Sequence, residues 1–208
     1  MESPVAGRVQ AFSRALLLMN PAARRFLTGK NHTGLNCEVE QYQIGQYIVY
    51  GSTGVCRVEG LVEKSPLGFY YVLKPLYESG TIYTPAEHPK VFMRPVISHE
   101  DAEALIDQIP GIVAQPDRTK NLQELREHYR TATCSHNCAD LIRLTMSIYA
   151  KKKEQEQMGR RFGQVDECFM KQAESILFGE FAVALGISRA EVHDYISRRV
   201  ECLRAVQV

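Results

Sequence analysis

The sequence contains no tryptophan, almost no net charge and no long apolar run. Its 208 residues carry 25 Lys and Arg against 24 Asp and Glu. A net charge of +1 gives no overall positive field that would draw the chain to nucleic acid. No apolar run approaches the roughly 18 residues that indicate a membrane span. We therefore expect no membrane partner, and any DNA contact should be local, weak and dependent on another protein already bound there.

The motifs that identify common enzyme classes are also missing. There is no glycine-rich phosphate loop, nucleophile elbow or H-E-x-x-H run. Cys56 lies in an alternating strand pattern, which favours a buried structural thiol over a nucleophile. We expect no enzymatic activity, no catalytic residue, no cofactor and no small-molecule substrate.

The cysteines are scattered along the chain and do not form the dense framework of a small secreted domain. This pattern predicts free thiols in a reducing cytoplasm. Two nitrogen and two sulfur groups within eleven residues could suit tetrahedral zinc, namely His128, Cys134, His136 and Cys138. Their C-x-H-x-C step is tighter than the usual two-to-four-residue gap, so we expect no metal and keep zinc as a remote alternative.

A small β-barrel is predicted between Tyr42 and Ile97. Five short segments there are rich in β-branched and aromatic residues, and turn clusters containing glycine separate them. The expected strands are Gln46 to Tyr50, Val55 to Val62, Phe69 to Leu76, Thr81 to Thr84 and Val91 to Val96. Because proline has no backbone donor, Pro75 and Pro85 should lie at a sheet edge or a bulge.

Amphipathic helices are predicted after the barrel. Ser98 caps a helix that Pro110-Gly111 ends, and the segment up to Thr119 has the composition of a linker. Beyond it, apolar residues at helical spacing form four stripes, with a cap at Asn137, a stop at Gly186 and a capping box at Ser188 and Glu191. The first three stripes are Leu122, Leu125, Tyr129 and Ala132; Leu141, Leu144, Thr145 and Ile148; and Phe169, Ala173, Ile176, Leu177 and Ala184. The fourth is Tyr195, Ile196, Val200 and Leu203.

Two groups of motifs carry a resemblance to a known family. IGQYIVYGSTGVCRVEG, YYVLKPL, TPAEH and MRPVIS occur in this order, and AESILFGEFAVALG follows downstream. Together they resemble the CarD/CdnL family of bacterial transcription regulators over roughly residues 42 to 190. The resemblance implies an α+β fold, with an N-terminal Tudor/SH3-like β-barrel that binds the RNA polymerase β subunit and an all-α C-terminal domain that contacts promoter DNA. We divide the chain into a flexible extension (1–41), the Tudor-like domain (42–98), a helix and linker (99–119) and the helical domain (120–208).

The resemblance also assigns the polymerase-binding residues. In the family, the strand that here reads Thr81 to Thr84 meets the β subunit, so Tyr83, Thr84 and Pro85, with Lys64 from a neighbouring turn, are the expected contacts. The family often has a basic residue where Tyr83 stands, and an aromatic anchor is a reasonable substitute at an interface. The alternative is an edge strand that Pro85 merely protects from pairing.

The DNA-binding residues are assigned by the same comparison. Many family members place a Trp wedge early in the helical domain, where this chain has Leu122, which lacks the stacking face. Asp166 and Glu167 stand where relatives tend to be basic. The expected DNA-binding residues are Arg118, Lys120, Leu122, Arg126, Lys151, Lys152, Lys153, Arg160 and Arg161. A solvated helix face explains the same basic residues without any ligand.

Two functions follow from this reading. The first is a monomeric, cytoplasmic transcription regulator that binds the polymerase β subunit and modulates open-complex stability through weak DNA contacts near the upstream fork. The second is a protein-interaction adaptor of the same fold with no direct DNA role.

Overall fold

The computed structural model describes residues 42–66 and 68–206 of the chain. The extension predicted for residues 1–41 lies outside these ranges. None of the helices in the described ranges has both the length and the apolar character needed to cross a bilayer.

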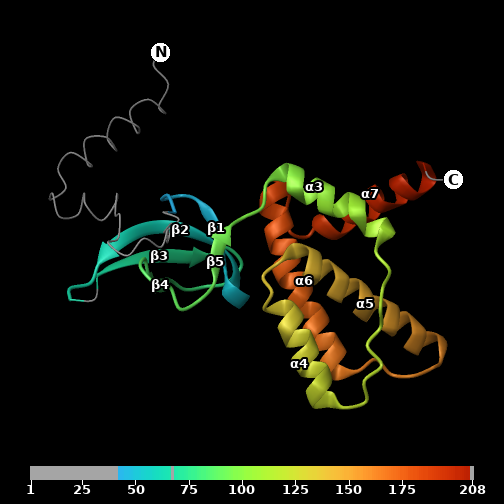
Figure 1. Ribbon diagram of the computed structural model, residues 1–208. Helices are drawn as coiled ribbons and strands as arrows, with labels where there is room; N and C mark the ends of the chain where they lie inside the picture. The colour runs from blue at the N-terminus through green and yellow to red at the C-terminus, as the bar shows by residue number, and fades with distance from the viewer. Residues whose placement is uncertain (1–41, 67, 207–208) are drawn as a thin grey trace, which may run out of the picture. The chain divides into compact units, whose positions relative to one another are not determined.

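An antiparallel sheet of five strands occupies the N-terminal part (Figure 1). The strand order is β4-β3-β2-β1-β5, so β4 and β5 are the two edges of the sheet. A short 3-10 turn, Gly51–Thr53, joins the first two strands. The strands are β1 (Tyr47–Tyr50), β2 (Gly54–Glu63), β3 (Phe69–Pro75), β4 (Ile82–Pro85) and β5 (Met93–Pro95).

The predicted strands are confirmed to within two residues at each end, and two details differ. Among the described residues, β4 and β5 do not pair with each other, so the expected barrel is open between these two strands. Pro85 ends the edge strand β4, as predicted. Pro75 instead is the last residue of the interior strand β3, so the backbone N–H that proline lacks is missing only at the end of the ladder. The β-bulge lies elsewhere, between Val58 and Gly60 of β2.

Alternation along the strands separates two faces of the sheet, and on one of them Val49 and Val55, which pair across the ladder, are buried. On the other face the buried side chains of β1 to β3 pack together into a core, and Tyr42 packs against them from the segment before β1. The residues of this core are Ile48, Cys56, Val58, Tyr71 and Leu73.

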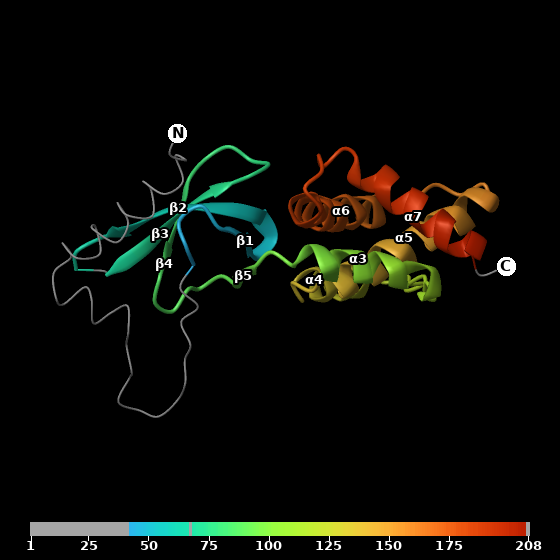
Figure 2. The same ribbon diagram turned by 90° about the horizontal axis from the view of Figure 1, so that it is seen from above.

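Five α-helices follow the sheet and form a bundle (Figure 1, Figure 2). They confirm the α+β fold. The helices are α3 (His99–Gln108), α4 (Leu122–Thr133), α5 (Cys138–Gln157), α6 (Gln164–Leu185) and α7 (Val192–Val206), with a 3-10 turn at Ile109–Gly111 after α3.

The predicted helix boundaries rest on caps that the structure contains. The Ser98 side chain accepts a hydrogen bond from the Asp101 amide, and Asn137 accepts one from the Ala139 amide. Gly186 ends α6 at a φ of 67°, a left-handed conformation that suits glycine. The Glu191 carboxylate accepts hydrogen bonds from the amide and the hydroxyl of Ser188, which forms the predicted capping box.

The helical core contains the predicted stripes with three differences. Of the fourth stripe, Tyr195 and Ile196 pack against the core, whereas Val200 and Leu203 are half-buried outside it. The helix α3, which the sequence analysis groups with the linker, packs on α6 and α7 and buries Ala102 and Ile106 in the same core. Leu122 begins α4 but is 58% exposed, whereas Leu125 and Tyr129 are buried. Leu122 lies at the first helical position, beyond the reach of the neighbouring helices, so it does not belong to the buried stripe.

Candidate functional site

The edge strand β4 presents an exposed aromatic residue beside a lysine. Tyr83 is 51% exposed and lies opposite Val72 of β3. The Lys64 ammonium, from the turn after β2, lies 4.0 Å from the centroid of the Tyr83 ring and 5.1 Å from that of Tyr70. These distances are short enough for cation–π attraction. The fold thus brings together two residues that the sequence analysis assigned to one site.

The outer-edge patch, as we call Val62, Lys64, Tyr70 and Tyr83, includes two residues that the sequence analysis missed. Val62 pairs with Tyr70 in the ladder between β2 and β3, and Val62 remains 36% exposed. Tyr83 pairs with Val72, and Tyr70 lies two residues before Val72, on the same face of β3. The strand register would therefore have identified Tyr70 and its partner Val62, but the sequence alone does not give that register.

Thr84 differs from its assigned role. The whole residue, backbone included, is 1% exposed, and it pairs across the ladder with Tyr71 of the buried core. A partner strand that pairs along β4 would therefore have to use the residues beside Thr84. Pro85 is half-buried opposite Tyr70 and closes the strand.

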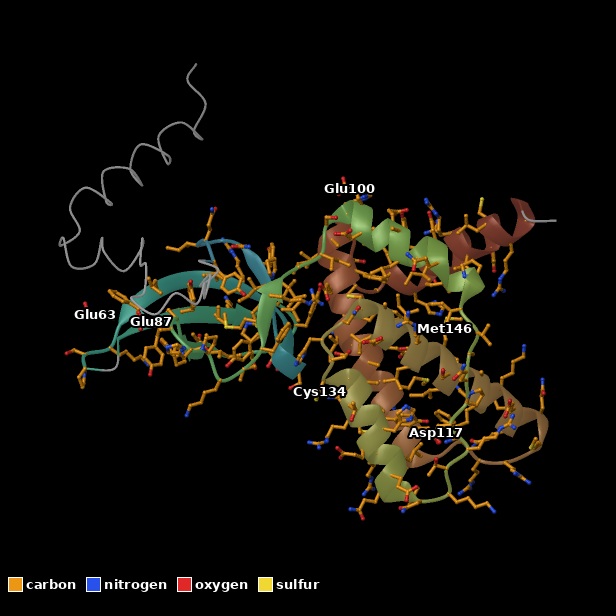
Figure 3. All side chains as sticks on the ribbon, viewed as in Figure 1. Glu63, Glu87, Glu100, Asp117, Cys134 and Met146 are labelled. Atoms are coloured by element: carbon orange, nitrogen blue, oxygen red, sulfur yellow. The ribbon has the colours of Figure 1, made fainter. Side chains whose placement is uncertain are left out.

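Acidic residues flank the outer-edge patch. Glu63 and Glu87 lie near the same end of the sheet (Figure 3). Lys64 therefore gives the patch no strong net positive charge. The distinguishing features of the patch are its aromatic rings and its place on β4, an edge strand of the described sheet.

Leu122, the residue in the position of the family's wedge, is accessible. The Asn121 side chain accepts a hydrogen bond from the Gln123 amide, which holds the start of α4 in place. Leu125 and Tyr129 anchor the same helix in the core. Leu122 is thus an exposed apolar side chain on a rigid element.

Lys151 does not fit the predicted DNA-binding set. Its ammonium lies 2.8 Å from Asp166 Oδ1, and both side chains are largely buried. The Tyr129 hydroxyl donates to the same carboxylate oxygen at 2.7 Å, and burial, followed by this hydrogen bond, raises the pKa of Tyr129. Lys151 is engaged in this internal pair, which makes it less available to DNA than the other predicted basic residues. Asp166, which stands where relatives tend to be basic, is itself buried.

The other predicted basic residues remain on the surface. Arg118 of the linker contacts Glu154 of α5 at 3.2 Å, and the Lys152 ammonium lies 5.8 Å from the Phe162 ring centroid. The linker also contacts α4, because His128 Nδ1 lies 2.7 Å from Asp117 Oδ2 (Figure 3). These contacts gather the linker, the end of α5 and the turn before α6. Within residues 42–66 and 68–206, the exposed members of the predicted set that form no salt bridge are Lys120, Arg126, Lys153, Arg160 and Arg161.

The four residues weighed as zinc ligands point to different neighbours. His128 contacts Asp117, the His136 ring stacks on Phe92 with centroids 4.5 Å apart, and Cys138 donates to Glu180. Cys134 is exposed. Over residues 42–66 and 68–206, no three His, Cys, Asp or Glu side chains are grouped so that they could hold a metal ion.

The buried cysteines are poor nucleophiles. Burial, and secondarily the charge of Glu78, raises the pKa of the Cys56 thiol to about 11. Burial and the neighbouring Glu180 carboxylate raise the pKa of Cys138 to about 12. Both thiols therefore stay protonated at neutral pH, and Cys56 is the buried structural thiol that the strand pattern predicted.

The comparisons with known proteins concern the sheet. Residues 42–97 match the family model described as "CarD-like/TRCF RID domain". The matched residues contain all five strands and end immediately before the cap of α3. No curated protein matches the chain at a significant level. The resemblance to the CarD/CdnL family is thus confirmed over the sheet, whereas the downstream resemblance in AESILFGEFAVALG stays a prediction. The match indicates a transcription-related protein, and residues 42–97 form its CarD-like RNA polymerase-interacting domain.

Proposed function

We propose that the protein is a transcription regulator that docks on the RNA polymerase β subunit through β4 and the outer-edge patch. The observation that carries this proposal is an exposed tyrosine on β4, which is an edge strand among the residues that the structure describes. A strand of the partner can add to β4 through main-chain hydrogen bonds. Tyr83 then supplies the aromatic anchor from which interfaces commonly draw most of their binding energy.

The helical domain supplies the second half of the proposed function. Leu122 is an exposed apolar residue that can wedge against an opened base step, and the exposed basic residues near it can contact phosphates. These residues are too few to find DNA unaided. Docking on polymerase raises their effective concentration at the promoter, which makes weak contacts effective.

The effect on transcription then depends on a difference in affinity. Contacts that are stronger to the melted promoter than to the closed promoter shift the equilibrium toward the open complex. Leu122 lacks an aromatic face, and Lys151 is engaged with Asp166, so both sources of DNA affinity are reduced. We therefore expect weaker stabilisation of the open complex than in relatives that carry the Trp wedge.

A direct test measures the affinity of the purified protein for fragments of the polymerase β subunit, with and without Tyr83→Glu. The proposal predicts binding by the wild type and loss of binding in the variant. Unchanged affinity of the Tyr83→Glu protein would remove β4 from the interface.

The internal Lys151–Asp166 pair favours a second candidate function. A protein with so little free positive charge could act as an adaptor that binds polymerase and leaves DNA untouched. Crosslinking to fork DNA in the presence of polymerase separates the two functions. An adaptor would give polymerase binding with no DNA crosslink.

A further inference from the structure

We infer that Gly179 and Glu180, two successive residues of α6, hold the sheet in a set orientation on the helical bundle, and that this orientation aims Leu122 when the sheet is docked. Glu180 and its partner Arg94 are thus positioning residues. The second part of the inference rests on the proposed function, and the first part does not.

The first attachment is a buried ion pair. Arg94 projects from the edge strand β5 and donates through both of its terminal nitrogens to the Glu180 carboxylate; the bond to Oε2 is 2.7 Å long. Glu180 is fully buried. Burial alone would lower the pKa of Arg94, but the hydrogen bonds and charge of Glu180 outweigh it and leave this pKa raised. Arg94 therefore keeps its positive charge in this buried position.

The remaining acceptor positions of Glu180 are also filled. The Ile97 amide, which follows β5, donates to Oε1 at 3.1 Å, and the Cys138 thiol at the start of α5 donates to Oε2 at 3.1 Å. Arg94 Nε reaches on to the His136 carbonyl at 2.9 Å. The Glu180 carboxylate thus joins α6 to the β5 segment and to the start of α5. These hydrogen bonds fix the orientation of the sheet, because a rotation of the sheet would leave oxygen atoms of the buried carboxylate without a hydrogen-bond donor.

The second attachment comes from the opposite side of the sheet. Tyr77, in the segment between β3 and β4, donates its hydroxyl to the Gly179 carbonyl at 3.2 Å. A Cβ at Gly179 would lie 2.9 Å from the Tyr77 ring, so the close approach requires glycine at this position. The Arg189 guanidinium lies 4.9 Å from the centroid of the same ring. One turn of α6 thus holds the edge strand β5 through Arg94 and the segment that precedes the other edge strand, β4, through Tyr77.

Two independent attachments on one helical turn restrain rotation as well as separation. A single contact or a flexible linker would let the sheet reorient, whereas the sheet and the helices in residues 42–66 and 68–206 belong to one compact unit. The start of α4 belongs to the same bundle as α6, so the position of Leu122 follows from that of the sheet. The effective concentration of Leu122 at the DNA falls steeply if the sheet and the helical bundle cannot contact polymerase and DNA at the same time. A fixed orientation between the sheet and the bundle avoids this loss.

The test uses Glu180→Gln, which keeps the shape of the side chain but removes its charge. Gly179→Ala perturbs the second attachment and leaves Glu180 intact, so it serves even if the first variant does not fold. Glu174→Gln is the matched control, because Glu174 lies on the same helix and accepts only an exposed hydrogen bond from Tyr149. Residual dipolar couplings of backbone amides then report the alignment of the sheet and of the helices separately.

The wild type and the control should fit one alignment tensor for both parts. The two junction variants should need two tensors, while their chemical shifts stay native within each part. In the presence of polymerase, crosslinking of residue 122 to fork DNA should fall about tenfold or more in the junction variants, with unchanged affinity for the β subunit.

Two tensors in the wild type, or one tensor with undiminished crosslinking in both junction variants, would overturn the inference. A wild type that shows one tensor but ignores polymerase would refute the proposed function and leave the junction itself established. The two failures are therefore distinguishable.

Discussion

The Lys64 ammonium lies 4.0 Å from the centroid of the Tyr83 ring, across the outer face of the sheet. Lys64 comes from the turn after β2 and Tyr83 from the edge strand β4. The contact orders a long, flexible side chain over an exposed ring and combines positive charge with aromatic surface. It defines the centre of the surface that we propose for polymerase docking.

Replacing Tyr83 with glutamate should weaken binding to the polymerase β subunit by about 30-fold, equivalent to about 2 kcal/mol for an interface anchor. The variant removes the ring and places a carboxylate next to Glu63 and Glu87. Titration calorimetry with a β-subunit fragment measures the change.

Two further variants control the Tyr83 experiment. Tyr83→Phe keeps the ring over Lys64 and should bind nearly as the wild type does. Ile44→Glu adds the same charge at another exposed apolar residue, outside the outer-edge patch, and should leave affinity unchanged. Equal losses from Ile44→Glu and Tyr83→Glu would show a charge effect without a defined anchor.

Leu122→Trp should lengthen the lifetime of the open complex by about two- to tenfold, the range expected for an added aromatic stacking contact. Leu122 is exposed at the start of α4, so the larger side chain causes no clash in the core. Lifetimes can be followed by challenging preformed complexes with a DNA competitor. An unchanged lifetime would remove Leu122 from the mechanism, and Leu122→Ala should shorten it.

The same substitution should destabilise the protein strongly at Lys151 and hardly at all at Lys153. Lys151→Met leaves the buried Asp166 carboxylate without its ion-pair partner, which should lower the free energy of unfolding by about 3 kcal/mol. Lys153 is exposed, so Lys153→Met should change stability by no more than about 0.5 kcal/mol. Urea denaturation measures both values.

Salt dependence gives the complementary readout. If Lys153 contacts a phosphate, Lys153→Met should reduce the log–log slope of polymerase-dependent DNA binding by about 0.9. A slope near zero in the wild-type protein would instead favour a solvated helix face with no ligand.

Cys56 should make stability fall at alkaline pH. Its pKa is raised from 9.0 to about 11 in the folded protein, so the unfolded chain releases this proton first. Below pH about 9 the protonated Cys56 thiol makes its full contribution to the free energy of unfolding. Between pH about 9 and about 11 this contribution should be lost, at up to about 1.4 kcal/mol per pH unit.

Comparison with Cys56→Ala isolates this contribution. The stability difference between wild type and Cys56→Ala, measured by denaturation under reducing conditions, should shrink over that pH range. Other groups that ionise there, including Cys138, are common to both proteins. A difference that stays constant from pH 8 to 11 would contradict the assigned burial.

Most of the fold could be predicted from local signals in the sequence. Period-2 segments between glycine turns predicted the strands, and Ser98, Asn137 and Gly186 marked helix ends because caps act through neighbouring backbone groups. The ladder register and the place of α3 in the core depend on residues distant in sequence, so no local pattern reveals them.

The candidate site was harder to predict for the same reason. Lys64 and Tyr83 were assigned from a family resemblance, and their contact depends on the register of three strands. The internal pairing of Lys151 could not be predicted locally, because its partner, Asp166, lies on the next helix. A charged residue in a helical pattern gives no sign of whether it faces solvent or a buried acid.

The most direct test of the central claim mixes the purified protein with bacterial core RNA polymerase at micromolar concentrations and separates the mixture by size. A complex should form with the wild type and should be lost with Tyr83→Glu. If the wild-type protein elutes apart from polymerase under these conditions, the claim that β4 and the outer-edge patch dock on the enzyme is contradicted.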